Sequence, residues 1–365
     1  MGLENLQIDL ITEILLRLPV KSLLRYRCVC KAFNSIISSQ NFINSHVKIT
    51  SDKRTHRQLV YRESQSATDK NSLKIHVLDI KDGSKKVFPI INMPPLHSFN
   101  TFLQAHCNGL LLLGQSFNSL TVWNPSTRKC RKLPVCPVKV PHNACGVTKF
   151  GLGYDSSADD YKVVVIKEIQ GPKISRVVEV WIFGLNSNSW RKIQDFPYLE
   201  YRIEDVESGT CFTDGALHYL CRHGQSYIII AFDLEKETFS VVPQPVYETS
   251  GCLTRLQVLE GRLCISFCSV LLNEVALFVR KRDGTEFSWS KLFSVSTEII
   301  YCLKFGKLLG LSDGGDKILI LYNKHIFSYE IGLCVQDIGI KDIQSAVDLD
   351  LILCIESLVS VGCTD

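Results

Sequence analysis

The sequence predicts a mainly β chain in which a small N-terminal α-helical domain precedes a β-propeller of about six blades. Three observations carry this prediction. Apolar residues recur at helical spacing only near the start of the chain. From residue 73 onward, short runs rich in Val, Ile, Leu, Phe and Tyr alternate with Gly, Asn, Asp, Ser and Pro. A strand–turn–strand unit also recurs at a spacing close to the roughly 50 residues of one kelch-type blade.

The first helix is marked by apolar residues at steps of three and four, namely Ile8, Ile11, Leu15 and Leu18. Leu10 and Ile14 lie outside that stripe, so the helix is apolar on two faces. Such a helix needs two partners, one of which can be another chain. Pro19 ends it and can open the next helix, whose body is Lys21 to Tyr26. Further helical segments are expected at residues 31–38 and 42–47.

Residues 48–72 are polar and form the expected junction, with a first strand near residues 58–62. Basic residues gather here, including Lys53, Arg54 and Arg57. They are compatible with a nuclear-import signal or a phosphate-binding patch, but a solvated linker is the favoured interpretation.

The repeating unit is anchored on a large apolar residue followed by a polar turn. The six anchors are Leu78, Trp123, Phe183, Phe232, Phe278 and Tyr329. A second hairpin with a glycine turn precedes most anchors, at Asn108-Gly109, Asp214-Gly215 and Glu260-Gly261, and two hairpins supply the four strands of a blade. The segment Leu351 to Val361 has no partner after it, so ring closure is expected to pair it with residues 58–62 and 73–80.

Composition excludes several classes of protein. Apolar residues make up 45% and charged residues 21%, which excludes a mainly disordered chain. A net charge of +4 is too weak to indicate a nucleic-acid or membrane surface, and no apolar run is long enough to span a bilayer. Fifteen cysteines and no signal peptide favour reduced thiols in the cytoplasm or nucleus.

Motifs for catalysis, metals or cofactors are absent from the sequence. Gly151-Leu152-Gly153 begins a dinucleotide-like pattern, but no helix follows it. His218, Cys221 and His223 are close in sequence, yet strand alternation places the first two on opposite faces. Asp159 and Asp160 fit a turn better than a glycosidase dyad. We therefore expect no catalytic residue, no metal and no cofactor.

Residues 6–31 resemble the plant F-box. The matching segment runs from Leu6 through Leu18-Pro19-Val20-Lys21 to Arg27-Cys28-Val29-Cys30-Lys31. Gln7 stands where the family usually has Pro, and Phe33 where it usually has Trp. The first departure is expected to weaken adaptor binding, and the second keeps an aromatic side chain.

Residues 100–310 are similar to the F-box-associated, kelch-like region of the same plant family. The pieces that match include Cys107-Asn108-Gly109, Trp123-Asn124-Pro125-Ser126-Thr127-Arg128, Gly153-Tyr154-Asp155, Ser189-Trp190-Arg191 and Ser288-Trp289. The resemblance implies an F-box over residues 1–47, a linker and first strand over residues 48–72, and a substrate-binding propeller over residues 73–365.

The resemblance also implies a function. The F-box would bind the Skp adaptor, and through it cullin, in an SCF-type ubiquitin ligase, while the propeller captures a protein substrate for ubiquitination and proteasomal degradation. The chain itself would perform no catalysis. Expected adaptor-facing residues, with the core behind them, are Leu6, Ile8, Ile11, Ile14, Leu15, Leu18, Pro19, Leu24, Val29 and Phe33. Substrate is expected on loops 134–149 and 195–208 at one rim.

Two other functions remain open at this point. One is a propeller scaffold that acts without the ligase, which the Gln7 departure makes plausible. The other is a propeller hydrolase or lectin, which requires carboxylates at equivalent positions of the repeats, and the sequence has none. Nothing in the sequence selects among pollen recognition, immunity and stress responses as the pathway.

Overall fold

The fold is described from a computed structural model that covers most of the chain. It describes residues 3–362 except 53–55, 64–74, 82–83, 88–101, 115–117, 142–145, 172–173, 204–209, 225, 248–250, 270–271, 273, 285, 296–306, 312–316, 323–324, 331–333 and 338–345. Residues 53–55 and 64–72 of the expected linker at residues 48–72 therefore lie outside the described residues. The expected strand at residues 58–62 lies within β1 (Arg57–Glu63).

Four helices form the N-terminal domain: α1 (Leu3–Leu15), α2 (Val20–Tyr26), α3 (Lys31–Ser38) and α4 (Gln40–Asp52). Pro19 is the residue before α2, and its φ of −65° suits a helix start. α4 is longer than the expected 42–47 segment because its buried face continues through Val47 and Thr50. The helical region consequently ends at Asp52, beyond the expected boundary at residue 47. None of the described helices is both long and apolar enough to cross a bilayer.

The described strands form six antiparallel sheets, each a propeller blade. The first blade joins β25 (Ala346–Ile355), β1, β2 (Ile75–Lys81) and β3 (Ser84–Val87). The second blade holds β4 (Phe102–Cys107), β5 (Leu110–Gly114), β6 (Leu120–Asn124) and β7 (Lys129–Lys132). The third holds β8 (Thr148–Asp155), β9 (Asp160–Gly171), β10 (Ile174–Gly184) and β11 (Ser189–Lys192).

The remaining three blades follow in chain order. The fourth holds β12 (Arg202–Ile203), β13 (Cys211–Thr213), β14 (Ala216–His223), β15 (Ser226–Asp233) and β16 (Thr238–Val242). The fifth holds β17 (Gly251–Leu259), β18 (Arg262–Ser269), β19 (Glu274–Asp283) and β20 (Glu286–Val295). The sixth holds β21 (Lys307–Leu311), β22 (Lys317–Tyr322), β23 (His325–Glu330) and β24 (Cys334–Asp337).

The six blades close into a ring. Each inner strand contacts the next, in the order β25, β4, β8, β13, β17, β21 and back to β25. The closing blade is made from both ends of the chain, because β25 pairs with β1 in a register that places Leu59 opposite Leu353. The predicted architecture is confirmed, as is the pairing of the C-terminal strand with residues 58–62. The expected pairing with residues 73–80 is wrong, because β2 lies on the far side of β1 from β25, and residues 356–361 do not form a strand.

The glycine turns have the predicted conformation. In the β4–β5 turn, Asn108 has φ 49° and Gly109 has φ 81°. Asp214-Gly215 and Glu260-Gly261 repeat this pair of positive φ values at the equivalent turns of two other blades. Two successive positive φ angles are the requirement of a type I′ hairpin turn, which explains Asn, Asp and Gly at these positions.

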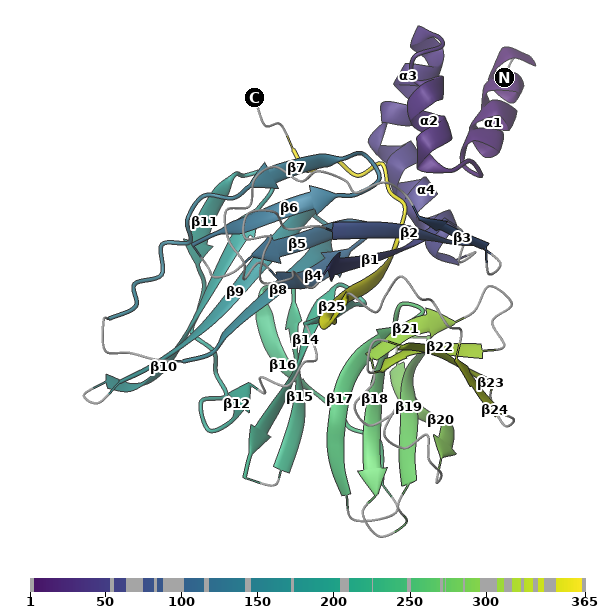
Figure 1. The fold of residues 1–365 in the computed structure, drawn as a ribbon. Helices are drawn as coiled ribbons and strands as arrows, with labels where there is room; N and C mark the ends of the chain where they lie inside the picture. Colours follow the sequence, from purple (N-terminus) through teal and green to yellow (C-terminus); the bar gives the residue numbers. More distant parts are fainter. Residues whose placement is uncertain are drawn as a thin grey trace, which may run out of the picture.

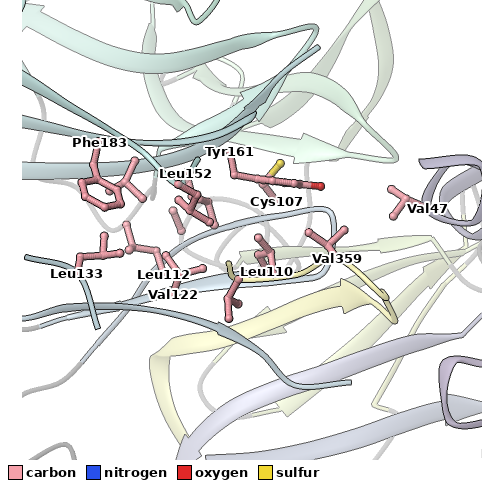
Figure 2. Close-up of a cluster of buried hydrophobic side chains, with 14 of the residues drawn as sticks. Val47, Cys107, Leu110, Leu112, Val122, Leu133, Leu152, Tyr161, Phe183 and Val359 are labelled. Atoms are coloured by element: carbon pink, nitrogen blue, oxygen red, sulfur yellow. The ribbon is translucent and has the colours of Figure 1, made fainter. Parts of the chain in front are cut away.

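One hydrophobic cluster connects the helices to the propeller. It contains Leu15, Leu23 and Val47 from the helical domain together with Leu110 and Phe183 from the second and third blades. Figure 2 shows Val47 at one end of this cluster, with the blade residues at the other. In Figure 1 the helices stand at one side of the ring, and the β14–β15 and β18–β19 ends point away from them.

Candidate partner-binding surface

The helical domain has its own core and a separate exposed apolar face. Leu15, Leu16, Val20, Leu23 and Ile37 are buried. The opposite side of α1 exposes Leu10 and Ile14, with 60% and 62% of their surface open to solvent, and Ile8, one turn before the core stripe is covered, is 48% exposed. Val29, in the turn between α2 and α3, is 66% exposed. Isolated exposed apolar residues are ordinary, but a group of them on one small domain marks an interaction surface.

The predicted adaptor-facing residues divide by burial. Ile8, Ile14 and Val29 are exposed, and Leu15 is buried in the core. A third group is half-buried, namely Ile11, Leu18, Pro19, Leu24 and Phe33. Leu6 lies in α1, but its side chain is outside the described residues. The structure thus separates residues that a partner can touch from residues that support the surface.

Two exposed residues are missing from the predicted set. Leu10 is one, and Tyr26, which is 40% exposed, is the other. The sequence carried a signal for Leu10, because it lies outside the core stripe of α1. Tyr26 could not be recognised from sequence because its exposure depends on the angle between α2 and α3, where its ring meets Phe33 edge-on at 6.1 Å.

The turn between α2 and α3 is held by short polar contacts. Cys30 precedes α3, and its sulfur accepts a hydrogen bond from the Phe33 backbone N–H at 3.4 Å. Arg27 Nε donates to Asn34 Oδ1 at 3.2 Å. These contacts fix the position of Val29 between them, so the exposed turn is ordered before any partner arrives.

The helical domain is attached to the propeller through α4. Gln40 Nε2 and Asn44 Nδ2 lie 3.4 and 3.5 Å from Asp159 Oδ1, in the turn between β8 and β9. Tyr154 also donates a hydrogen bond to Asp159. Inside the domain, His46 Nε2 lies 2.9 Å from the Leu18 carbonyl oxygen, and burial lowers the pKa of His46, so the neutral ring donates this bond.

This attachment defines two rims of the propeller. In a four-stranded meander, the turns between strands one and two and between strands three and four share an edge. Because α4 contacts the β8–β9 turn, that edge is the helix-side rim. The connections between blades, including the described residues of 133–141 and 193–203, lie on the opposite edge, which we call the distal rim.

The distal rim carries exposed apolar residues of its own. Val135, Leu199, Val246 and Leu272 lie on four of its connections and turns, and all four are exposed. The described parts of both loops predicted to bind substrate are on this rim, and residues 142–145 and 204–208 of them lie outside the described residues. The second loop contains the short strand β12, which pairs with β14.

Arg176 of β10 holds the loop after β11 in position through hydrogen bonds. This side chain forms a salt bridge with Glu168, with Nε and Oε1 2.9 Å apart, and also donates to the Leu199 and Tyr201 carbonyls. The exposed Leu199 therefore lies on a segment held by two hydrogen bonds from Arg176, whose guanidinium is itself held by Glu168. A preorganised loop loses less conformational entropy when it binds a partner.

The ionisable clusters of the propeller are structural. Lys162 Nζ lies 2.7 Å from Asp155 and 3.0 Å from Glu237, which links the third and fourth blades. Burial alone would raise the pKa of Asp155, but hydrogen bonds from Lys162 and Ser157 outweigh it and lower the pKa to about 2. Asp159 and Asp160 are a turn residue and the start of β9, as predicted.

Metal ligands do not converge in the part of the chain that the structure describes, where no group of three His, Cys, Asp or Glu side chains is placed to hold an ion. His218 is buried beside the Cys211 carbonyl, whereas His223 is exposed at the end of β14. The candidate sites among the described residues are the two exposed apolar surfaces, one on the helices and one on the distal rim.

Comparison with known proteins agrees with this division. Residues 3–45 match the F-box domain family, and residues 60–361 match the F-box associated beta propeller domain family. An F-box domain followed by this propeller defines the class. The chain belongs to the family of F-box proteins with an F-box-associated propeller.

Its relatives include several F-box proteins of Arabidopsis thaliana. F-box/kelch-repeat protein At3g23880 is 29% identical over 85% of this chain and 84% of its own length. F-box protein CPR1 is 27% identical over 99% of this chain and 90% of its own. Among solved structures, Citrobacter koseri AztD aligns with a TM-score of 0.40 at 12% identity, over 82% of this chain and 97% of that one.

Proposed function

We propose that this protein is the substrate-recognition subunit of an SCF-type ubiquitin ligase. Its F-box binds a Skp adaptor, which connects it to cullin, and its propeller holds a target protein for ubiquitination and degradation by the proteasome. The chain supplies no catalytic group. Its task is to keep the target near the charged ubiquitin enzyme, which raises the effective concentration of the attacking lysine.

The exposed apolar face of the F-box is the observation that carries this proposal. Ile8, Leu10 and Ile14 on α1 are solvent-exposed although Leu15 and Leu23 already provide the domain with a core. Burying a large aliphatic side chain contributes about 1.5–3 kcal/mol, so these three residues can drive association. Tyr26 at the end of α2 and Val29 in the α2–α3 turn are further exposed apolar residues of the same domain.

We assign the target protein to the distal rim. Val135, Leu199 and Val246 are exposed there on connections between blades, and loops on a rigid scaffold are the usual place for recognition. The helix-side rim is partly covered by α4, which leaves the distal rim as the accessible face of the same molecule. Target and adaptor would then lie on opposite sides of the ring.

The same proposal places the protein in the cytoplasm or nucleus. None of the ten cysteines whose side chains the structure describes forms a disulfide bond. Burial raises the pKa of several of them, including Cys136 to about 11 and Cys211 to about 12, which keeps them protonated and unreactive. A reducing compartment suits such a set of thiols.

Proximity labelling in plant cells tests the function. The intact chain is compared with Ile14→Asp, which places a charge on the exposed face of α1 without touching the core. With the proteasome inhibited, we expect neighbours of the intact chain to include Skp, cullin and ubiquitinated proteins. Ile14→Asp should retain the targets but lose Skp and cullin.

Two outcomes count against this function. If the intact chain never labels Skp or cullin, the propeller acts as a scaffold independent of the ligase. If proteasome inhibition leaves the amounts of all labelled proteins unchanged, degradation is not the outcome of binding.

A further inference from the structure

The chain does not end at its last strand. After β25, residues 356–361 continue across the helix-side rim, and we call this segment the strap. Ser357, Leu358, Val359 and Val361 are buried, with at most 6% of their surface exposed. A terminal segment is ordered and buried only when other elements bind it.

The second blade binds the strap from one side through the segment Asn124 to Arg131. Asn124 is fully buried, and its Nδ2 donates to the carbonyl oxygens of Ser357 and Val359 at 3.0 and 2.8 Å. Its Oδ1 accepts from the Ser126 and Thr127 backbone N–H groups. All four hydrogen bonds of a buried amide are thereby satisfied, and two of them hold the strap.

Further contacts extend this seat at both ends. Ser357 N–H donates to Ser126 Oγ at 3.2 Å. Arg131 Nη1 donates to the Val361 carbonyl at 3.2 Å and to the Leu185 carbonyl of the third blade at 2.8 Å. Asn124 and Ser126 of the Trp-Asn-Pro-Ser-Thr-Arg motif therefore have a physical role: together with Arg131, which follows the motif, they supply the seat of the strap.

The strap binds the F-box from its other side. Glu356 accepts a hydrogen bond from the Val20 backbone N–H, at the start of α2, with Oε2 2.9 Å away. Its other oxygen accepts from Gln58 Nε2 of β1 at 3.1 Å. Pro19 has no side-chain group that could cap α2, so a carboxylate from the far end of the chain satisfies this donor.

Apolar packing follows the same path. Leu358, Val359 and Val361 belong to the hydrophobic cluster that includes Leu16 and Val20 of the F-box. Figure 2 shows Val359 between Val47 of α4 and Leu110 of β5. The strap is thus a layer between the two domains.

We infer that the strap, seated on Asn124 to Arg131, is the joint that fixes the F-box on the propeller, and that Glu356 and Asn124 are its positioning residues. α4 meets the propeller at Asp159, and the strap adds a second attachment at Val20, at the start of α2. Two separate attachments fix the angle between the domains, and the strap supplies the second. The consequence for ubiquitin transfer rests on the proposed function, because a fixed angle holds the distal rim at one distance from the adaptor.

The test measures the geometry of the free, full-length protein. Two labels are introduced through unnatural amino acids, because the chain has fifteen cysteines. Lys31 on α3 and Lys236 between β15 and β16 are exposed positions for them. Single-molecule energy transfer then reports the distribution of distances between F-box and propeller.

Four variants separate positioning from stability. Glu356→Ala removes the two carboxylate oxygens that accept hydrogen bonds from Val20 and Gln58. Asn124→Ala removes the two hydrogen bonds that hold the strap on the second blade. Glu356→Gln keeps an acceptor for Val20, and the Gln58 amide can rotate to accept from the new amide. Glu200→Ala is the matched control, since this glutamate is exposed in the loop after β11.

We expect a narrow distribution for the wild type, Glu356→Gln and Glu200→Ala, and a broadened one for Glu356→Ala and Asn124→Ala. The melting temperature of Glu356→Ala should stay close to that of the wild type. If the distance distribution of Glu356→Ala superimposes on that of the wild type, the inference is overturned. If Asn124→Ala fails to fold, the result for Glu356→Ala is sufficient to decide. No adaptor is present, so the result is independent of the proposed function.

Discussion

At the scale of single residues, close packing decides how much each turn glycine matters. Gly109 and Gly215 occupy the same turn position in two blades, with φ of 81° and 74°. A Cβ added at Gly109 would collide with Ser357 Cβ, whereas nothing lies within 4 Å of one added at Gly215. A turn glycine therefore has open space beside it in one blade, at Gly215, and contacts the strap in another, at Gly109.

We expect Gly109→Ala to cost more free energy of unfolding than Gly215→Ala. The positive φ costs roughly 1–2 kcal/mol at either site, and displacing the strap adds roughly 1–3 kcal/mol at Gly109. Chemical denaturation of both variants measures the difference. Equal losses would show that the strap yields without cost at this point.

His218 makes stability depend on pH. It is 1% exposed, and burial together with the charge of Arg280 lowers its pKa to about 4. The unfolded chain binds the proton near pH 6.5, so stability is fully present above that value and falls as the pH drops toward 4.

His218→Gln should remove part of this acid sensitivity. Between about pH 7.5 and about pH 5, the wild type should lose about 2 kcal/mol through this residue, a loss absent from the variant. Urea denaturation at the two pH values measures it, with His223→Gln as an exposed control. If His218→Gln loses as much as the wild type, His218 is protonated in the folded state.

At the scale of elements, two tryptophans join successive blades. Trp190 of β11 donates through Nε1 to the Pro134 carbonyl at 2.8 Å, and Trp289 of β20 donates to the Pro243 carbonyl at 2.7 Å. Each proline ends the outer strand of the preceding blade. The recurrence of strand-ending prolines and Ser-Trp pairs in the sequence thus has one structural cause.

Replacing either tryptophan by phenylalanine keeps the aromatic packing and removes the hydrogen bond between blades. We expect Trp190→Phe and Trp289→Phe each to cost about 1 kcal/mol. Trp181→Phe is the comparison, because Trp181 bonds Glu179 within its own strand. Thermal melting followed by circular dichroism measures all three, and equal losses would exclude a special role for the contact between blades.

The elements that were predictable from sequence are those with a local signal. Pro19, the Asn108-Gly109 turn and the apolar stripe of α1 each identify their structure without distant partners. The strap was predicted only as a closing strand, because nothing near Glu356 reveals that Val20 is its partner. Likewise, Asn124 was recognised as part of a family motif, but its bonds to residues more than 200 positions away follow only from the ring.

At the scale of the whole molecule, the F-box and the propeller share one core. Leu16 and Val20 lie in the same cluster as Leu358 and Phe183, and the strap bonds to both domains. Domains that share a core unfold together.

We therefore expect the full-length protein to unfold in a single transition, seen alike by a label at Lys31 and by the tryptophans of the propeller. The fragment of residues 1–52 should show little helix alone, because its buried faces have lost the strap and blades. Circular dichroism of the fragment and two-probe denaturation of the full chain check both. Two separated transitions, or a folded fragment, would show independent domains.

The central claim is that the exposed apolar face of α1 binds a Skp adaptor. Isothermal titration of the full-length protein with purified Skp tests it most directly, comparing wild type, Ile14→Asp and Ser51→Asp, which places the same charge on the exposed face of α4. We expect the wild type and Ser51→Asp to bind alike and Ile14→Asp to bind about thirtyfold more weakly, a loss of roughly 2 kcal/mol. Absence of binding by the wild type, or equal binding by Ile14→Asp, would contradict the claim.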